Sequence, residues 1–325
     1  MPELAVPERC NGWRLDRFVR EHLPGMPLSH VFKLFRTGKV RLDGRKVAAS
    51  TRVAEGQVVI VHVPEGRFAE DASVHTLPAR GRVVPPFGLE VVYEDAELIA
   101  INKPAGVPVH PGSGYAGGTC IDRILEYLGH VRSPGAFAPA LLHRIDAGTS
   151  GVLLAAKTYR ALRILSKAFS QRRVQKLYRA LAAGAPIPDA GTIDLPVRRL
   201  DGPPRPYKEV HGVTEYRVVS RATRPGLAAR GWPAHVALLD LSILTGRTHQ
   251  IRSHLKSVGA PIVGDATYGD PVVNSVAVRE AGLTRQFLHA ASLVFTHPVT
   301  SERVVIDAPL PADLKKILEV LGINN

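Results

Sequence analysis

The chain has 325 residues, 45% of them hydrophobic, which is enough for one large domain with a substantial core and a second, smaller domain. Its 42 Lys and Arg residues outnumber 29 Asp and Glu residues, giving a formal net charge of +13. This balance suits a nucleic acid or an anionic membrane as partner. No apolar stretch approaches the ~18 residues that span a bilayer, and MPELAVPERC lacks a secretory signal pattern. We expect a cytoplasmic protein that binds nucleic acid rather than membrane.

The cysteines and histidines do not indicate a metal centre. Cys10 and Cys120 are too few and too far apart for a disulfide framework or for a zinc site built on paired cysteines. The 13 histidines include no HExxH pair. We therefore expect no metal.

A compact N-terminal unit is expected over residues 12–66. Apolar residues recur at helical spacing in GWRLDRFVREHL, and a second helix is expected in HVFKLFRTGK with Ser29 as its N-cap. VRLDGRKV alternates apolar and polar residues around Asp43-Gly44, a dipeptide typical of tight hairpins. The second helix and the hairpin carry six cations, which form either a phosphate-binding surface or a solvated charged face: Lys33, Arg36, Lys39, Arg41, Arg45 and Lys46.

A linker is expected over residues 67–88, because their charge is scattered and their periodicity is weak. A larger domain should then occupy residues 89–325. LIAIN and GVLLAAK are nearly continuous apolar runs, typical of buried strands. The glycine-rich residues 104–118 lack both nucleotide-binding fingerprints and are interpreted as a loop, and 183–212 and 220–233 as surface excursions.

The densest polar segment is HRIDAGTSG, residues 143–151, between an apolar stretch and the strand-like GVLLAAK. An acid in a short loop at a strand edge is well held yet reachable, so Asp146 is a candidate catalytic residue. The same residues also fit a structural aspartate that caps Thr149 or Ser150. A serine nucleophile is disfavoured, because the segment lacks the Gly-x-Ser-x-Gly elbow.

Two further segments carry candidate site residues. LTGRTHQIRSHLKSVG, residues 244–259, predicts a turn and then a helix that ends at Gly259. Arg247 precedes the helix, while Arg252 and Lys256 lie four apart on one face, which fits either a binding surface or a solvated helix. In RVQKLYRALAAG, residues 173–184, Tyr178 falls in a strand-like run, where a lone tyrosine usually belongs to the core.

The motifs HRIDAGTSG, KLYRA and TGRTHQIRSH, in this order, resemble the RluA family of RNA pseudouridine synthases. The resemblance extends to LIAINKPAGVPVHPGSG, APIVGDATYGD and FLHAASLVFTHP, and so to most of residues 89–310. It implies an α+β catalytic domain with a central mixed, largely antiparallel β-sheet flanked by helices. The N-terminal unit resembles the S4 RNA-binding domain, a small α/β fold, which favours RNA as the ligand of its cations.

The resemblance also implies roles for five residues. Asp146 is the expected catalytic carboxylate, although its attack at C1′, addition at C6 and a glycal route all stay open. Arg247 is the expected cation that keeps Asp146 ionised. Arg144 is expected to fill the gap left by a flipped uridine, Tyr178 to lie over the uracil, and Leu288 to form part of the apolar wall.

The expected reaction breaks the N1–C1′ bond of uridine and joins C5 to C1′, which needs no cofactor. The whole chain looks closest to the branch of the family that modifies large-subunit ribosomal RNA, so we expect 23S ribosomal RNA as partner and a monomeric enzyme. Ile145 and Ala147-Gly148 depart from the usual motif, which puts RNA contacts there in doubt. Transfer RNA as substrate, a non-catalytic ribosome-assembly factor and a nucleosidase are the alternatives.

Overall fold

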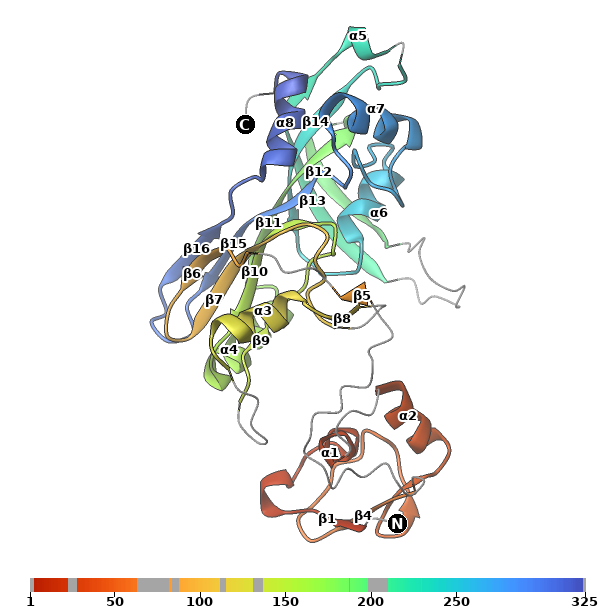
Figure 1. Ribbon diagram of the computed structural model, residues 1–325, viewed down its shortest axis with the longest axis vertical. Coiled ribbons are helices and arrows are strands. Elements are labelled where there is room, and N and C mark those ends of the chain that lie inside the picture. The colour runs from red at the N-terminus through yellow and green to blue at the C-terminus, as the bar shows by residue number, and fades with distance from the viewer. Residues whose placement is uncertain are drawn as a thin grey trace. The chain divides into compact units, whose positions relative to one another are not determined.

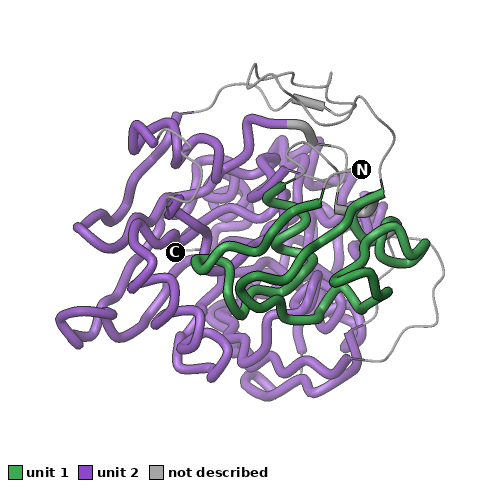
Figure 2. Tube along the Cα trace, turned by 90° about the horizontal axis from the view of Figure 1, so that it is seen from below, with its two compact units in different colours: residues 1–79 green, residues 80–325 purple. Residues whose placement is uncertain are grey.

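The computed structural model describes residues 3–22, 28–62, 82–83, 88–111, 115–130, 137–186, 188–197, 210–228 and 230–323. The chain divides into two compact units, residues 1–79 and 80–325 (Figure 2). Among the described residues, no helix combines the length and the apolar character needed to cross a membrane.

The first unit is a four-stranded antiparallel sheet with two helices, and its strands run in the order β1-β4-β2-β3. Its elements are β1 (Glu3–Ala5), the 3-10 helix η1 (Glu8–Cys10), α1 (Leu15–His22), α2 (Leu28–Arg36), β2 (Val40–Leu42), β3 (Arg45–Lys46) and β4 (Val58–Val61). Because β1 pairs with β4, the unit starts earlier in the chain than the expected residue 12.

The predicted hairpin is confirmed. Asp43 and Gly44 both have positive φ, 49° and 75°, as a two-residue turn with matching strand twist requires. Val40 and Leu42 are buried while Arg41 between them is exposed, so the alternation in the sequence reports the two faces of β2. The predicted cap is wrong, because α2 begins at Leu28 and places Ser29 inside the helix.

The second unit is built on a ten-stranded mixed sheet, flanked by helices, as the fold expectation stated (Figure 1). Its main path runs β12-β13-β14-β11-β15-β10-β7-β6, with β16 paired to β15 and β9 to β10. The contact between β10 and β15 is parallel and the other pairs of this sheet are antiparallel.

The strands of this sheet are β6 (Val91–Glu94), β7 (Leu98–Lys103), β9 (Ala140–Leu141), β10 (Ser150–Ala156), β11 (Gln175–Ala183), β12 (Ala190–Pro196), β13 (His211–Ala222), β14 (Val236–Ile243), β15 (Leu288–Thr296) and β16 (Arg303–Asp307). A separate pair joins β5 (Arg82–Val83) to β8 (Tyr115–Gly117). The helices are α3 (Cys120–Tyr127), α4 (Tyr159–Ser170), α5 (Pro225–Ala228), α6 (Gln250–Ser257), α7 (Pro271–Ala281) and α8 (Ala312–Leu321).

Two hydrophobic cores cover opposite faces of the central strands. Alternate residues of β10 divide between them: Leu153 belongs to the core that includes Ile124 of α3 and Leu314 of α8. Leu154 belongs to the core that includes Leu165 of α4. Every residue of β10 is buried, which is why the sequence shows an uninterrupted apolar run there.

Regular structure replaces parts of the expected irregular segments. Residues 190–196 form β12, which pairs along its whole length with β13, so this part of 183–212 is an edge strand of the sheet. Residues 225–228 form α5 within the second expected excursion. The short strand β5 lies in the expected linker 67–88, most of which is outside the described residues.

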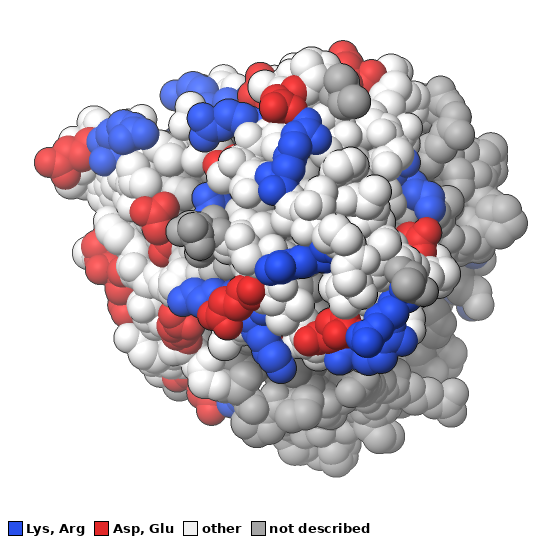
Figure 3. All heavy atoms as spheres, turned by 90° about the horizontal axis from the view of Figure 1, so that it is seen from above, with Lys and Arg blue, Asp and Glu red and all other residues white. Residues whose placement is uncertain are grey.

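Acidic and basic side chains are interspersed on the face seen from above in the orientation of Figure 1 (Figure 3). The positive excess of the sequence therefore does not form a uniform basic patch on that face.

Gly151 lies at the start of β10, directly after the loop that carries Asp146. A substitution at Gly151 can therefore show how closely β10 must approach β15. Its φ is +116°, and a Cβ there would lie 2.1 Å from the carbonyl oxygen of Ala290 on β15. We expect Gly151→Ala to lower the free energy of unfolding by roughly 3 kcal/mol, through backbone strain and overlap. Urea denaturation measures this.

The matched control is Gly226→Ala, because a Cβ at Gly226 meets nothing within 4 Å. It should leave stability unchanged or raise it by up to about 1 kcal/mol. Equal stabilities of the two variants would contradict the close approach of β10 and β15.

Candidate active site

A small open pocket gathers residues from all three sequence motifs. Its lining includes each of the five residues with an expected role in the catalytic domain: Arg144, Asp146, Tyr178, Arg247 and Leu288. They come from the loop before β10, from β11, from the turn before α6 and from β15. Segments more than a hundred residues apart in the chain thus meet at one place, which the sequence order alone could not show.

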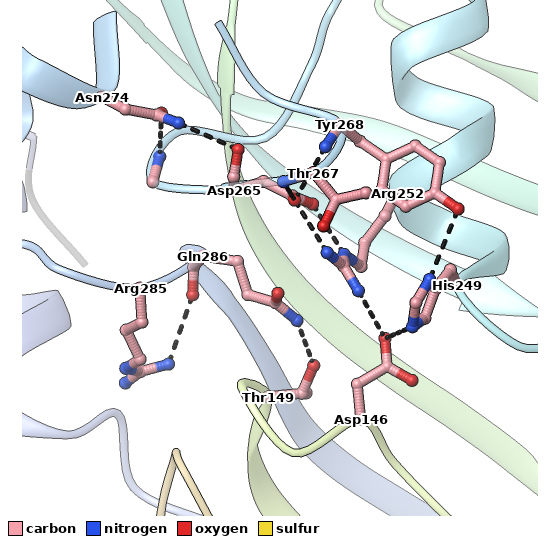
Figure 4. Close-up of polar contacts among 11 residues, drawn as sticks. Asp146, Thr149, His249, Arg252, Asp265, Thr267, Tyr268, Asn274, Arg285 and Gln286 are labelled. Carbon is pink, nitrogen blue, oxygen red and sulfur yellow. Dashed lines mark hydrogen bonds and ion pairs between the residues drawn. The ribbon is translucent and has the colours of Figure 1, made fainter. Parts of the chain in front are cut away.

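Asp146 lies in a turn that leaves its carboxylate available. The turn is closed by the backbone, since the amide of Thr149 donates to the carbonyl oxygen of Asp146 at 3.0 Å. The Asp146 carboxylate instead contacts Arg252 Nη1 at 3.3 Å and His249 Nε2 at 3.8 Å (Figure 4). The structural alternative, in which this side chain caps Thr149 or Ser150, is therefore not what the structure shows.

Two side chains, Lys103 and Gln286, hold the loop around Asp146. Lys103, which is fully buried, donates Nζ hydrogen bonds to the carbonyl oxygens of Pro104, Val107 and Ala147 at 2.8, 2.8 and 2.9 Å. Gln286 donates to Thr149 Oγ1 at 2.8 Å. Burial lowers the pKa of Lys103 to about 8, but the three carbonyl acceptors satisfy its ammonium group.

Ser150 and Gly151 complete the attachment of the loop. Ser150 Oγ lies 2.9 Å from Nδ1 of the buried His289 on β15. Together with the close backbone approach at Gly151, this explains the small residues in the motif: they join the loop to the sheet while the aspartate faces the pocket.

Arg252 is the cation at Asp146, whereas the sequence had suggested Arg247. In the described part of the chain, the arginine that contacts the Asp146 carboxylate is Arg252, and Arg247 lines the same pocket with an exposed side chain. The difference arises in the turn before α6. Gln250 accepts hydrogen bonds from Thr245 Oγ1 and from the backbone amide of Arg247, so Arg247 stays in the turn while Arg252 enters the buried first part of α6.

A second carboxylate, Asp265, orients Arg252. Arg252 Nε and Nη2 donate to the two carboxylate oxygens of Asp265 at 2.6 and 2.8 Å, and Nη1 remains for Asp146 (Figure 4). Both partners are buried, Asp265 with 1% and Arg252 with 7% of its surface exposed. The planar guanidinium can bind one carboxylate in a fork and still reach another, which a lysine could not do.

Asp265 and Arg252 each stabilise the charged form of the other. Burial by itself raises the pKa of Asp265, but hydrogen bonds from Arg252 and from the amides of Tyr268 and Thr267 outweigh it, so the pKa is lowered overall. Burial likewise lowers the pKa of Arg252, and the hydrogen bonds and charges of Asp265 and Asp146 reverse this. Arg252 is therefore a permanent positive charge beside Asp146.

Tyr178 and Leu288 form part of the pocket wall. Both side chains are buried, with 7% and 4% of their surface exposed. Burial, and then the negative charge of Asp146, raises the pKa of Tyr178. The phenol therefore stays protonated at neutral pH.

His249 is a further side chain that sequence reasoning missed. It has a left-handed backbone, with φ of 58°, directly before α6, and its Nδ1 lies 3.3 Å from the Tyr268 hydroxyl. The ring of Tyr268 lies edge-on to the ring of His249. The guanidinium of Arg252 lies 5.0 Å from the centre of the Tyr268 ring. Asp265 and Tyr268 both belong to APIVGDATYGD, residues 260–270. The resemblance of that segment to the family was the sequence signal that could have indicated these two residues.

Metal binding finds no support in the residues that the structure describes: they include no group of three or more His, Cys, Asp or Glu side chains arranged to hold an ion. Asp265 does not form a catalytic pair with Asp146 either, because both of its oxygens bind Arg252. The site thus offers one accessible carboxylate, a buried cation beside it and an aromatic wall.

The cationic residues of the first unit belong to residues 1–79, whereas the pocket belongs to residues 80–325. Arg36, Lys39, Arg41, Arg45 and Lys46 are exposed, as a binding surface or a solvated face both require. The side chain of Lys33 lies outside the described residues. The RNA-binding role of these residues stays a prediction.

Comparison with known proteins identifies the chain's relatives. A sequence model described as RNA pseudouridylate synthase matches residues 97–257. An uncharacterized RNA pseudouridine synthase of Chloroflexus aurantiacus is 36% identical over 98% of this chain and 93% of the relative. Ribosomal large subunit pseudouridine synthase C of Vibrio cholerae is 34% identical over 97% and 95%. The solved structure of human RNA Pseudouridylate Synthase Domain Containing 4 superposes with a TM-score of 0.55 at 26% identity, covering 73% of this chain and 94% of that one.

The Arg252–Asp265 pair predicts a specific pH dependence. Because the folded state lowers the pKa of Asp265, the pair contributes stability that is complete above the unfolded pKa near 4 and is lost as pH falls through the folded pKa. We expect Asp265→Asn to cost about 3 kcal/mol at pH 7 and to flatten the loss of stability below pH ~4. Activity should fall by about 100-fold, since Arg252 is no longer oriented. Urea titrations at several pH values and turnover assays measure these effects.

Asp313→Asn is the matched control. Asp313 also binds an arginine through both oxygens, Arg285 at 2.6 and 3.0 Å, but its side chain is 43% exposed. Its loss should cost at most about 1 kcal/mol and leave turnover unchanged. If Asp265→Asn behaved like this control, the buried pair would not orient the site.

Proposed function

We propose that this chain, which belongs to the RluA family of RNA pseudouridine synthases, converts uridine to pseudouridine in the RNA of the large ribosomal subunit. The observation that carries the proposal is the Asp146 carboxylate in an open pocket, paired with the buried Arg252. The near-complete match to a relative named for the large subunit supports the choice of ribosomal RNA.

The reaction needs an ionised carboxylate at the bond that breaks. The uracil leaves C1′ through N1, turns, and rejoins through C5, and the proton at C5 is then released. Positive charge develops at the sugar when the N1–C1′ bond breaks, and a carboxylate either stabilises that charge or bonds to the carbon, as in glycosidases. Asp146 supplies this group, and the positive charge of Arg252 lies 3.3 Å from its carboxylate.

The pocket walls suit a base that has left its helix. Tyr178 offers a buried aromatic ring on which uracil can stack, and Leu288 offers an apolar surface. Arg144 is exposed beside Asp146, and its planar guanidinium can stack in the gap that a flipped base would leave. The base is thereby held while the sugar stays at Asp146.

A large structured RNA fits the charge of the chain. The formal net charge of +13 draws in a polyanion, and the exposed cations of the first unit provide a second contact surface. Two separate RNA-contacting surfaces favour an extended ribosomal RNA substrate over transfer RNA. Metal-free, cofactor-free catalysis by a monomer remains part of the proposal.

Tritium release tests the catalytic assignment. With ribosomal RNA labelled at uridine C5, the wild-type protein should release tritium into water, because C5 loses its hydrogen after the new bond forms. Asp146→Asn keeps the size of the side chain but removes its charge, and release should fall below detection. Tritium release by this variant at the wild-type rate would remove Asp146 from the chemistry, and free uracil as product would indicate a nucleosidase.

Mapping of pseudouridines in total RNA tests the substrate. We expect cells that lack this protein to lose one or more pseudouridines from large-subunit ribosomal RNA, and expression of the wild-type chain, but not of Asp146→Asn, to restore them. Loss confined to transfer RNA would contradict the ribosomal assignment. An unchanged pseudouridine map would favour the assembly-factor alternative.

A further inference from the structure

Lys176 extends the row of side chains that forms the wall of the catalytic pocket. It lies two residues before Tyr178 on β11, and residues two apart in a strand face the same side. The burial of β11 follows this rule, since Lys176 is half-buried and Tyr178 buried, whereas Gln175 and Leu177 are exposed. The strand rise places Lys176 about 7 Å from Tyr178 along β11.

The ammonium group of Lys176 lies beside the mouth of the pocket. Lys176 Nζ is 3.8 Å from the position that a Cβ would occupy on Gly246, which itself lines the pocket with Asp146. Lys176 is also close to His143, in the motif that carries Asp146: burial first, and then the charge of Lys176, lowers the pKa of His143 to about 3. The neighbouring imidazole of His143 is therefore neutral and adds no charge of its own beside Lys176.

Arg172 is a second cation that acts on Lys176. Burial, and then the positive charge of Arg172, lowers the pKa of Lys176. Arg172 follows α4 with a left-handed backbone, φ of 59°, a conformation that an arginine adopts at a cost of about 1 kcal/mol or more. Arg172 thus combines a strained backbone with an unfavourable interaction between its positive charge and that of Lys176.

Neither cation has a carboxylate partner within the described part of the chain. The next basic residue of the strand behaves differently, because Arg179 faces the other side and pairs with Asp240 at 3.1 Å. Two cations that repel each other and have no described counter-charge, one of them half-buried, form a site that an anion would stabilise.

We propose that Lys176 and Arg172 together bind one phosphate of the RNA backbone next to the uridine that enters the pocket. The inference rests on the proposed function for the identity of the ligand, an RNA phosphodiester. Lys176 contributes a point charge at the pocket mouth and Arg172 a fork of donors from the solvent side. The contact sets which nucleotide of a strand stands opposite Asp146, because the phosphate fixes the register while the base turns inward.

The salt dependence of RNA binding tests this site. Affinity for a short oligouridine is measured at several salt concentrations in the Asp146→Asn background, so that turnover does not interfere. Each phosphate contact on a single strand contributes about 0.7 to the slope of log affinity against log salt. We expect Lys176→Gln and Arg172→Gln each to reduce the slope by about this amount, and the double variant to lose less affinity than the two single losses combined, because both act on one phosphate.

Two control variants separate charge from packing and from net charge. Lys176→Arg retains the cation and should retain the slope, while a purely structural role would make it fail like Lys176→Gln. Lys315→Gln removes one positive charge from an exposed position on α8 and should leave slope and affinity unchanged. Thermal unfolding of each variant confirms that the fold is intact.

The outcomes distinguish this inference from the proposed function. If wild-type protein releases tritium but Lys176→Gln and Arg172→Gln keep the slope of Lys315→Gln, the phosphate site is overturned and the enzyme assignment stands. If the slopes fall but no tritium is released, the phosphate site stands and the catalytic assignment fails. Unaltered slopes together with no release overturn both.

Discussion

The sharing of one buried guanidinium between two carboxylates is the interaction on which the site depends. Asp265 binds two nitrogens of Arg252 and Asp146 receives the third. A pair of charges about 4 Å apart is worth roughly 4 kcal/mol at an effective dielectric of ~20, which offsets the cost of placing a carboxylate under a stacked base. Without Asp265, Arg252 would be a flexible cation, and without Arg252, Asp146 would face the pocket with no permanent counter-charge.

The rest of the site serves to bring Asp146 to this guanidinium. Lys103 ties the carbonyl of Ala147 to β7, Gln286 holds Thr149, and Gly151 lets β10 approach β15 more closely than any side chain allows. All three contacts use the backbone or a neighbouring hydroxyl, so the carboxylate itself remains available. A loop of small residues between a lysine and a glycine can therefore be rigid while its one acid stays reactive.

Charge is arranged differently inside the pocket and at its mouth. Inside, Arg252 contacts both Asp146 and Asp265. Arg144 and Arg247 line the pocket, and neither they nor Lys176 and Arg172 have a carboxylate partner among the described residues. This absence of pairing fits the contacts with phosphates and bases that we propose for them. Pairing thus separates the cations that build the site from those proposed to bind RNA.

The sequence by itself determined the local structure and most of the pocket residues. Periodicity and turn chemistry specify the hairpin at Asp43-Gly44 and the buried strand β10, because both depend on neighbouring residues only. Motif resemblance indicated Asp146, Tyr178 and Leu288. Only the tertiary structure decided that Arg252, rather than Arg247, meets Asp146, since this depends on the turn that begins α6 and on Asp265 from a separate segment. Ion pairs between distant segments follow from three-dimensional packing, which no spacing along the chain encodes.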